Sequence, residues 1–123
     1  MNLLTGVDLV ETDRIARAIE RQGEAFLMRV YTQQELDLCR GNSQSLAARF
    51  AAKEAVSKAL GTGFAGFGFT DVEVLRGTLG EPLLTLHGNA ATLAKRLGVQ
   101  SWSISLSHTQ QHAIAMVVAL VVG

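Results

Sequence analysis

Residues 49–63 read Arg-Phe-Ala-Ala-Lys-Glu-Ala-Val-Ser-Lys-Ala-Leu-Gly-Thr-Gly, a segment around which the other elements of the chain can be arranged. Alanine, leucine, lysine and glutamate are strong helix formers, and they fill most of this segment. Asn42 and Ser43 upstream are typical N-caps, and Gly61 is a typical C-cap. The pattern therefore predicts a long helix that begins near residue 42 or 43 and ends at Gly61.

Two charged residues of this helix form a pair. Glu54 and Lys58 lie one turn apart, on the stripe that also carries Ala47 and Ala51. A carboxylate and an amine flanked by alanines indicate a helix face with another element close against it. The alternative is a surface Glu–Lys pair, which stabilises a helix by only about 0.2–0.5 kcal/mol.

Size and composition predict a single domain, residues 1–123, whose 48% hydrophobic content is enough for a core. Eleven basic and eleven acidic side chains cancel, which argues against a polycationic surface for nucleic acid. Cys39 is the only cysteine, so an internal disulfide is excluded and a reducing, cytoplasmic location is indicated.

A membrane segment is not predicted. Residues 1–10 contain no basic run and include Asp8, unlike a signal peptide. The most hydrophobic run, residues 113–122, is too short to span a bilayer and is rich in valine, which indicates a buried strand instead.

Asp8 interrupts an apolar run, residues 3–10, that otherwise predicts a β-strand. An ionised carboxylate in such a strand is costly unless it is paired, hydrogen-bonded or bound to a cation. From the residues alone, a cap of the following turn is favoured over a metal ligand, because Glu11 and Asp13 come immediately afterwards.

A helix over residues 14–22 is predicted next, with Thr12 or Asp13 as its N-cap. Three arginines share one face of this helix: Arg14, Arg17 and Arg21. They form either an ordinary solvated surface or a cationic stripe for an acidic partner, since like charges at this spacing repel one another slightly.

The remaining segments predict shorter elements. Thr32 and Glu35 have the spacing of a capping box at the start of a helix. Helices are predicted over residues 24–30, 32–40 and 87–97, and strands over residues 70–75, 83–86, 100–106 and 112–122. This order predicts an α+β domain with a largely antiparallel sheet and the long helix packed on it. The last strand is apolar on both faces, so it is either central or covered by another subunit.

Two further patterns are less specific. Residues 62–69 alternate glycine with phenylalanine and predict a mobile or ligand-hugging loop. His108 and His112 have the spacing of a metal-binding pair, but no third ligand-type residue is nearby, so a zinc site is not favoured.

Three separated blocks of the sequence carry a family resemblance. They are Gly6-Val7-Asp8-Leu9-Val10-Glu11 with Arg14-Ile15, Arg49-Phe50-Ala51-Ala52-Lys53-Glu54-Ala55 with Lys58-Ala59-Leu60-Gly61-Thr62-Gly63, and Ser103-Ile104-Ser105-Leu106-Ser107-His108-Thr109. In this order and spacing, the chain resembles the holo-acyl-carrier-protein synthases, which are short 4′-phosphopantetheinyl transferases. Residues 31–36 are a weaker fourth match, and the middle block is the specific one.

The resemblance implies the 4′-phosphopantetheinyl transferase fold and a cytoplasmic enzyme. Such an enzyme moves the phosphopantetheine arm of coenzyme A onto a serine of apo-acyl carrier protein and releases adenosine 3′,5′-bisphosphate. The family uses Mg²⁺ and commonly forms a homotrimer with active sites between subunits. Trimerisation would also cover the apolar last strand.

The resemblance also implies catalytic roles for Asp8, Glu54 and Lys58. Mg²⁺ takes one or two carboxylates and completes its octahedron with phosphate and water, so Asp8 and Glu54 match as metal ligands. With the resemblance, a metal ligand is favoured at Asp8 over a cap of the following turn. Lys58 would neutralise the diphosphate or protonate the leaving phosphate oxygen. The acceptor serine would be activated by Glu54 through a water or by a metal-bound water, and the sequence does not choose between them.

Substrate-binding residues follow from the same likeness. Coenzyme A would be bound by Arg49, Lys58, Gly61, Pro82, His108 and Thr109, with Arg49 and His108 on its phosphates. Arg14 and Arg21 match positions that bind the acidic recognition helix of the carrier protein, whereas Arg17 has no such match.

The chain departs from the family at Gly80-Glu81-Pro82, where the family usually has Gly-Lys-Pro. If that lysine touches a phosphate of coenzyme A, Glu81 would repel it. Two rival functions are a non-catalytic module that binds carrier protein and a nucleotide-binding trimer that has lost catalysis. Both are disfavoured because Asp8, Glu54 and Lys58 are all present.

Overall fold

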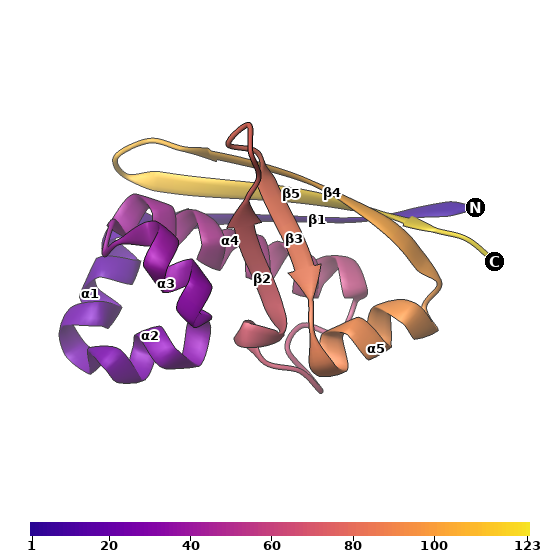
Figure 1. Ribbon diagram of the computed structural model, residues 1–123, viewed down its shortest axis with the longest axis horizontal. Coiled ribbons are helices and arrows are strands. Elements are labelled where there is room, and N and C mark those ends of the chain that lie inside the picture. Colours follow the sequence, from indigo (N-terminus) through magenta and orange to yellow (C-terminus); the bar gives the residue numbers. More distant parts are fainter.

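The computed structural model describes residues 1–123 and shows one long helix packed between an antiparallel sheet and several smaller elements (Figure 1). The helices are α1 (Thr12–Gln22), α2 (Glu24–Val30), α3 (Gln33–Cys39), α4 (Ser43–Leu60) and α5 (Gly88–Arg96), and a 3-10 turn, η1, covers Phe69–Asp71. The strands are β1 (Asn2–Glu11), β2 (Val72–Arg76), β3 (Pro82–Leu86), β4 (Val99–His108) and β5 (His112–Val121). The predicted α+β class is confirmed.

Two antiparallel sheets make up the β structure. The larger has the order β1-β5-β4, so β5 is the central strand. The smaller is the predicted hairpin of β2 and β3, which crosses in front of α4 in the view of Figure 1 and brings β3 against β4 of the larger sheet. Helices α1, α2 and α3 gather near the start of α4, while α5 lies near its end. No helix combines the length and the apolar content that a bilayer-spanning segment needs.

Helix α4 ends where the sequence predicts and is buried on nearly all sides. The Asn42 side chain accepts a hydrogen bond from the Ser45 amide at 2.9 Å, and Gly61 closes the helix with a φ of 84°. Strand β1 approaches so closely that a Cβ added at Gly6 would lie 1.8 Å from the carbonyl oxygen of Ala55. Small residues on both elements therefore permit the contact that the alanine-flanked stripe predicted.

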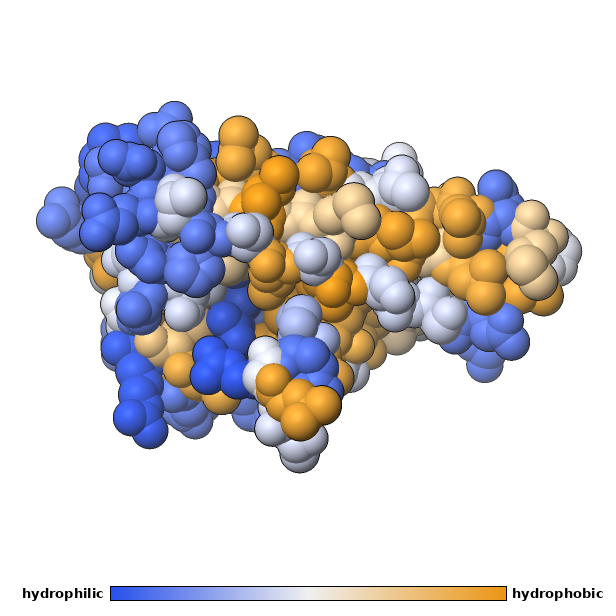
Figure 2. All heavy atoms as spheres, turned by 90° about the horizontal axis from the view of Figure 1, so that it is seen from above, coloured by the Kyte–Doolittle hydropathy of each residue, from blue (hydrophilic) through white to orange (hydrophobic).

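The larger sheet has one covered face and one open face. Alternate residues of β5, from Ala113 to Ala119, are fully buried against α4. Their neighbours point outward, with Ile114 40% and Met116 50% exposed. Leu3, Val7 and Leu9 of β1 continue this outer face, which Figure 2 shows as a broad hydrophobic area. Strand β5 is thus central, and its outer side remains uncovered in the single chain.

A buried ion pair, which the sequence analysis did not predict, fastens α4 to α3 and β2. The ammonium of Lys53 lies 2.8 Å from Glu35 Oε1, and both side chains are fully buried. Lys53 also donates to the carbonyl oxygens of Phe69, at 3.0 Å, and Val72. Glu35 in turn accepts hydrogen bonds from the amides of Thr32 and Val74. The predicted capping box of α3 is confirmed and is one part of this network.

Three boundaries near the site differ from the prediction. Strand β4 continues to His108 instead of ending at residue 106. The N-cap of α1 is Glu11, without a side-chain hydrogen bond, so the predicted cap at Thr12 or Asp13 is wrong. The Thr12 amide donates to the carbonyl of Gln111 at 2.8 Å, so the chain passes from β1 into α1 without a separate turn. The hairpin begins at Val72 because residues 69–71 form the η1 turn.

The glycine-phenylalanine segment is anchored by its aromatic rings. Phe64 stacks on Phe69 with ring centroids 4.0 Å apart, and Phe69 stacks on Phe50 of α4 at 5.4 Å. Phe67 is buried beside them. The phenylalanines thus attach the loop to the core.

Candidate functional site

The contact between β1 and α4 brings Asp8 and Lys58 together. Lys58 Nζ donates to Asp8 Oδ1 at 3.1 Å and to the carbonyl oxygen of Val7 at 3.0 Å. The Asp8 side chain is 17% exposed and that of Lys58 is 54% exposed, so the pair lies at the surface. The Asp8 carboxylate pairs with this ammonium and accepts no backbone hydrogen bond, so it does not cap a turn.

Glu54 belongs to the same cluster. Its pKa is raised above the ordinary value, first by burial and then by the negative charge of Asp8. The positive charges of Arg14 and Lys58 oppose this shift. Two carboxylates and two cations therefore share one environment at the junction of β1, α1 and α4, which we call the carboxylate site.

Arg14 reaches the carboxylate site from α1. Its guanidinium carbon lies 5.4 Å from the centroid of the Phe50 ring, one helical turn before Glu54. Arg14 is exposed, as are Arg17 and Arg21 further along the helix. The three arginines thus form a solvent-facing stripe with Arg14 at its inner end.

The carboxylate site suits a cation that takes few protein ligands. No three residues among the chain's histidines, cysteines, aspartates and glutamates are close enough together to enclose a metal ion. Mg²⁺ is bound in many phosphoryl-transfer sites by one or two carboxylates, with substrate oxygens and water completing the octahedron. Burial of Glu54 and the negative charge of Asp8 both disfavour an ionised Glu54, and a cation bound between the two carboxylates would offset these effects.

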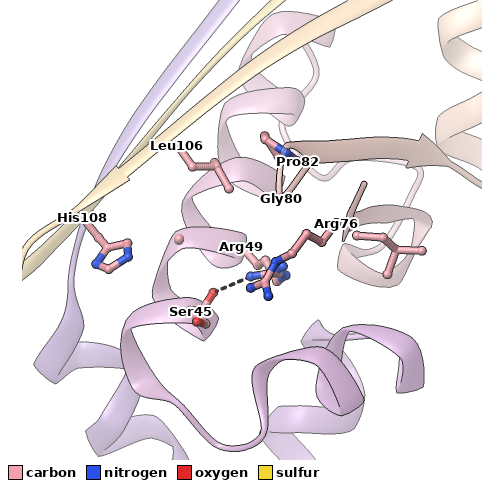
Figure 3. A pocket seen from close by; sticks show the side chains of 9 residues that line it. Ser45, Arg49, Arg76, Gly80, Pro82, Leu106 and His108 are labelled. Carbon is pink, nitrogen blue, oxygen red and sulfur yellow. Dashed lines mark hydrogen bonds between the residues drawn. The ribbon is translucent and has the colours of Figure 1, made fainter. Parts of the chain in front are cut away.

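A second site is a pocket of about 200 Å³ between α4, the β2–β3 hairpin and β4 (Figure 3). We call it the arginine pocket. Its lining residues are Ser45, Ala48, Arg49, Leu75, Arg76, Gly80, Pro82, Leu106 and His108. Three of the residues predicted to bind coenzyme A therefore come together here: Arg49, Pro82 and His108.

Arg49 is held rigidly in the arginine pocket. Its side chain is almost fully buried, its Nε donates to the carbonyl of Val74 at 2.9 Å, and one terminal nitrogen donates to the carbonyl of Ser45 at 3.3 Å. None of the chain's ion pairs involves Arg49. A buried guanidinium without a carboxylate partner is costly, which makes this pocket receptive to an anion.

Other predicted residues lie outside the arginine pocket. Gly61 ends α4, one turn beyond Lys58. Thr109 follows His108 in the β4–β5 turn, where its hydroxyl accepts hydrogen bonds from the amides of Gln111 and His112. The residues predicted to bind coenzyme A are thus divided between the carboxylate site, the arginine pocket and these two turns.

The hairpin turn clarifies the position of Glu81. Its carboxylate accepts a hydrogen bond from the Leu79 amide at 2.9 Å and covers Gly77. Glu81 does not line the arginine pocket, whereas Arg76, which the sequence analysis missed, does. No local sequence pattern marks Arg76, because its place in the pocket follows from the register of the hairpin, in which it pairs with Pro82.

Comparisons with known proteins identify the family. A profile of the 4′-phosphopantetheinyl transferase superfamily matches residues 5–117. A Herpetosiphon aurantiacus protein named holo-[acyl-carrier-protein] synthase is 50% identical over 125 residues, covering 96% of this chain and 98% of that protein.

Solved structures show the same fold. The Helicobacter pylori holo-[acyl-carrier-protein] synthase in complex with coenzyme A has a TM-score of 0.87 and 36% identity, over 95% of this chain and all of that one. A Bacillus anthracis holo-(acyl-carrier-protein) synthase in complex with CoA (3′,5′-ADP) has a TM-score of 0.77 and 31% identity, over 94% of both chains. Sequence and structure together place this chain in the 4′-phosphopantetheinyl transferase superfamily, to which it belongs.

Proposed function

We propose that this protein transfers the 4′-phosphopantetheine arm of coenzyme A to a serine of apo-acyl carrier protein. The observation that carries the proposal is the grouping of Asp8, Glu54 and Lys58 at the carboxylate site of a chain that belongs to this family. Relatives that carry the synthase name and have been crystallised with coenzyme A support the choice of substrates.

The residues divide the chemistry among them. Asp8 and Glu54 would hold Mg²⁺, which supplies positive charge against the phosphate oxygens when it is bound. The serine oxygen attacks the phosphorus that carries pantetheine, and the bond from this phosphorus to the bridging oxygen breaks. Lys58 neutralises the leaving adenosine bisphosphate. We assign the serine proton to Glu54 through a water, because Asp8 is paired with Lys58 whereas Glu54 takes part in no ion pair.

Substrate positions are proposed on the same basis. Arg49 and His108 bind phosphates of coenzyme A in the arginine pocket, where Pro82 contributes to the wall. Lys58, Gly61 and Thr109 border the nucleotide from the end of α4 and from the β4–β5 turn. A single domain working in the cytoplasm fits coenzyme A as substrate and Cys39 as a free, buried thiol.

The direct test is incubation with apo-acyl carrier protein, coenzyme A and Mg²⁺, followed by intact-mass measurement of the carrier. A gain of one phosphopantetheine is expected with Mg²⁺, and none in the presence of EDTA. No gain with a carrier that a known synthase modifies would instead favour a non-catalytic binding module.

The arginine stripe on α1 is expected to control the encounter with the acidic carrier protein. The double variant Arg14→Gln/Arg21→Gln should raise the KM for carrier protein roughly 5- to 10-fold at low salt, because two exposed charge pairs are lost. Its affinity for coenzyme A, measured by calorimetry, should stay within about 2-fold. Arg17→Gln removes the same charge from the same helix and serves as the control, with little expected effect. Equal losses for both substrates would argue against the stripe.

A homotrimer is proposed because the family commonly forms one, and the hydrophobic, uncovered outer face of the larger sheet offers a surface for the neighbouring subunits. Lys58 borders a hollow with Thr5, Gly6, Val7 and Met116, so the carboxylate site opens toward this face. A neighbouring subunit on the outer face would therefore border the active site as well as bury the exposed side chains.

Met116→Glu tests the trimer. Burying a carboxylate in a hydrophobic interface is costly, so light scattering should show a trimer for the unaltered protein and a monomer for the variant. Thr85→Glu places the same charge on an exposed position of β3 and should leave the trimer intact. A monomeric unaltered protein at micromolar concentration would contradict the proposal.

A further inference from the structure

The arginine pocket holds more positive charge than the residues already assigned to it. Arg49, Arg76 and His108 all line it, and none of them takes part in an ion pair. The three ion pairs of the chain involve Lys53, Lys58 and His87. Two guanidinium groups and an imidazole therefore face one pocket without a carboxylate to balance them.

Arg76 lies close to Arg49 although the two come from different elements. It is the last residue of β2, paired across the hairpin with Pro82, and Figure 3 shows its side chain extending toward that of Arg49. Burial raises the pKa of the Cys39 thiol, and the charges of Arg49 and Arg76 both oppose the shift, so both guanidinium groups act on the same buried atom.

The nearby carboxylates have other partners. Glu81 is turned onto the hairpin, where it accepts the Leu79 amide at 2.9 Å. Asp37 lines a neighbouring hollow together with Arg76 and accepts a hydrogen bond from the Gln33 side chain at 3.0 Å. Neither forms an ion pair with Arg76, whose exposed guanidinium is therefore available to a ligand.

We propose that Arg76 and Arg49 together bind the 3′-phosphate of coenzyme A and that Arg76 is the residue by which this chain distinguishes coenzyme A from its 3′-dephosphorylated form. This inference rests on the proposed function. A phosphomonoester carries a charge of about −1.5 to −2 at neutral pH, which two guanidinium groups match better than one.

The position of the pocket selects this phosphate over the diphosphate. The diphosphate is the reacting group and has to lie at the carboxylate site, with Glu54 and Lys58. Arg49 precedes Glu54 by about 7.5 Å of rise along α4, so a phosphate held by the arginine pocket is a different one.

The test is calorimetry with coenzyme A and with 3′-dephospho-coenzyme A, using the full chain at one fixed salt concentration. Arg76→Gln should weaken the binding of coenzyme A by about 10- to 100-fold, the usual effect of losing a charged hydrogen bond. Its affinity for dephospho-coenzyme A should change by less than about 2-fold. Arg96→Gln removes one exposed charge from α5 and should alter neither affinity.

Arg76→Lys keeps the charge but lacks the planar fork, so it should recover only part of the discrimination. Equal losses for both ligands, or no loss for either, would overturn the inference. The unaltered chain could transfer phosphopantetheine while Arg76→Gln prefers coenzyme A over dephospho-coenzyme A as strongly as the unaltered chain does. In that case the inference about Arg76 fails and the proposed function stands. If the unaltered chain does not bind coenzyme A, the proposed function fails with it.

Discussion

Glu54→Gln is expected to lower the rate of phosphopantetheine transfer by at least about 10³-fold. The substitution keeps the shape of the side chain but removes a carboxylate that is proposed both to hold Mg²⁺ and to receive the serine proton, and general base catalysis alone contributes about 10²–10⁴-fold. The rate should be measured by intact mass at saturating coenzyme A and Mg²⁺, so that weaker substrate binding is separated from slower chemistry.

The same variant should remain folded. The Glu54 side chain makes no hydrogen bond within the chain, and its ionised form is disfavoured by burial and by Asp8. Because its folded pKa lies above its unfolded pKa, ionisation lowers the free energy of unfolding as pH rises through this range. Without divalent cations, ionisation of Glu54 should therefore lower stability as the pH rises above about 4.5, and Glu54→Gln should lack this contribution.

Glu20→Gln is the matched control, because it removes one exposed carboxylate from α1. Its transfer rate and its stability should both be close to those of the unaltered protein. A Glu54→Gln variant that kept more than about a tenth of the activity would exclude the carboxylate from the chemistry. A variant that unfolded would show that Glu54 has a structural role instead.

Short-range rules explain why the charges of the carboxylate site meet, although the sequence analysis linked Asp8 to Glu54 only through the family resemblance. Alternation along β1 puts Asp8 on the same face as Gly6 and Val10, and that face packs on α4. Helical spacing puts Glu54 and Lys58 on one stripe. Once β1 and α4 are known to touch, these two patterns suffice to bring the charges together.

The arginine pocket is harder to predict because it depends on pairing between distant segments. Arg49 and His108 are recognisable only by family resemblance, and Arg76 has no local pattern that marks it as functional. Its position follows from the register of the hairpin, in which Arg76 faces Pro82, and from the way the hairpin crosses α4. Neither the register nor the crossing can be read from the spacing of residues along one element.

Lys53 illustrates the same limit within the core. Lys53 precedes Glu54 in the sequence, and helical spacing alone does not show which of the two charged side chains is buried. In the structure Glu54 is partly exposed, whereas Lys53 is fully buried, because β2 and α3 cover that side of α4. Helix α4 is buried on nearly all sides and has no broad solvated face. The exposure of a charged residue such as Lys53 therefore cannot be predicted from its position along the helix.

Lys53→Met is accordingly expected to lower the free energy of unfolding by about 3–5 kcal/mol, the usual cost of breaking a buried ion pair on one side. Glu35 would be left buried with one cationic partner fewer, and the carbonyl oxygens of Phe69 and Val72 would lose their donor. A domain of this size is stable by about 5–15 kcal/mol, so the loss should be plain in urea denaturation.

Lys58→Met is the control for Lys53→Met, since it makes the same substitution in the same helix where the side chain is 54% exposed. Its cost in stability should be within about 1 kcal/mol, because surface ion pairs contribute little. A loss below about 1 kcal/mol for Lys53→Met would mean that the buried pair is not a structural contact of this strength.

A double-mutant cycle with Glu35→Gln decides whether the effect belongs to the pair. Removing either charge alone leaves the other buried, whereas removing both leaves none, so the double variant should lose less stability than the sum of the single variants. The difference should still leave a net loss, because Glu35 also accepts the amides of Thr32 and Val74 and fixes α3 to β2. Simple additivity would show instead that Lys53 acts through the backbone carbonyls alone.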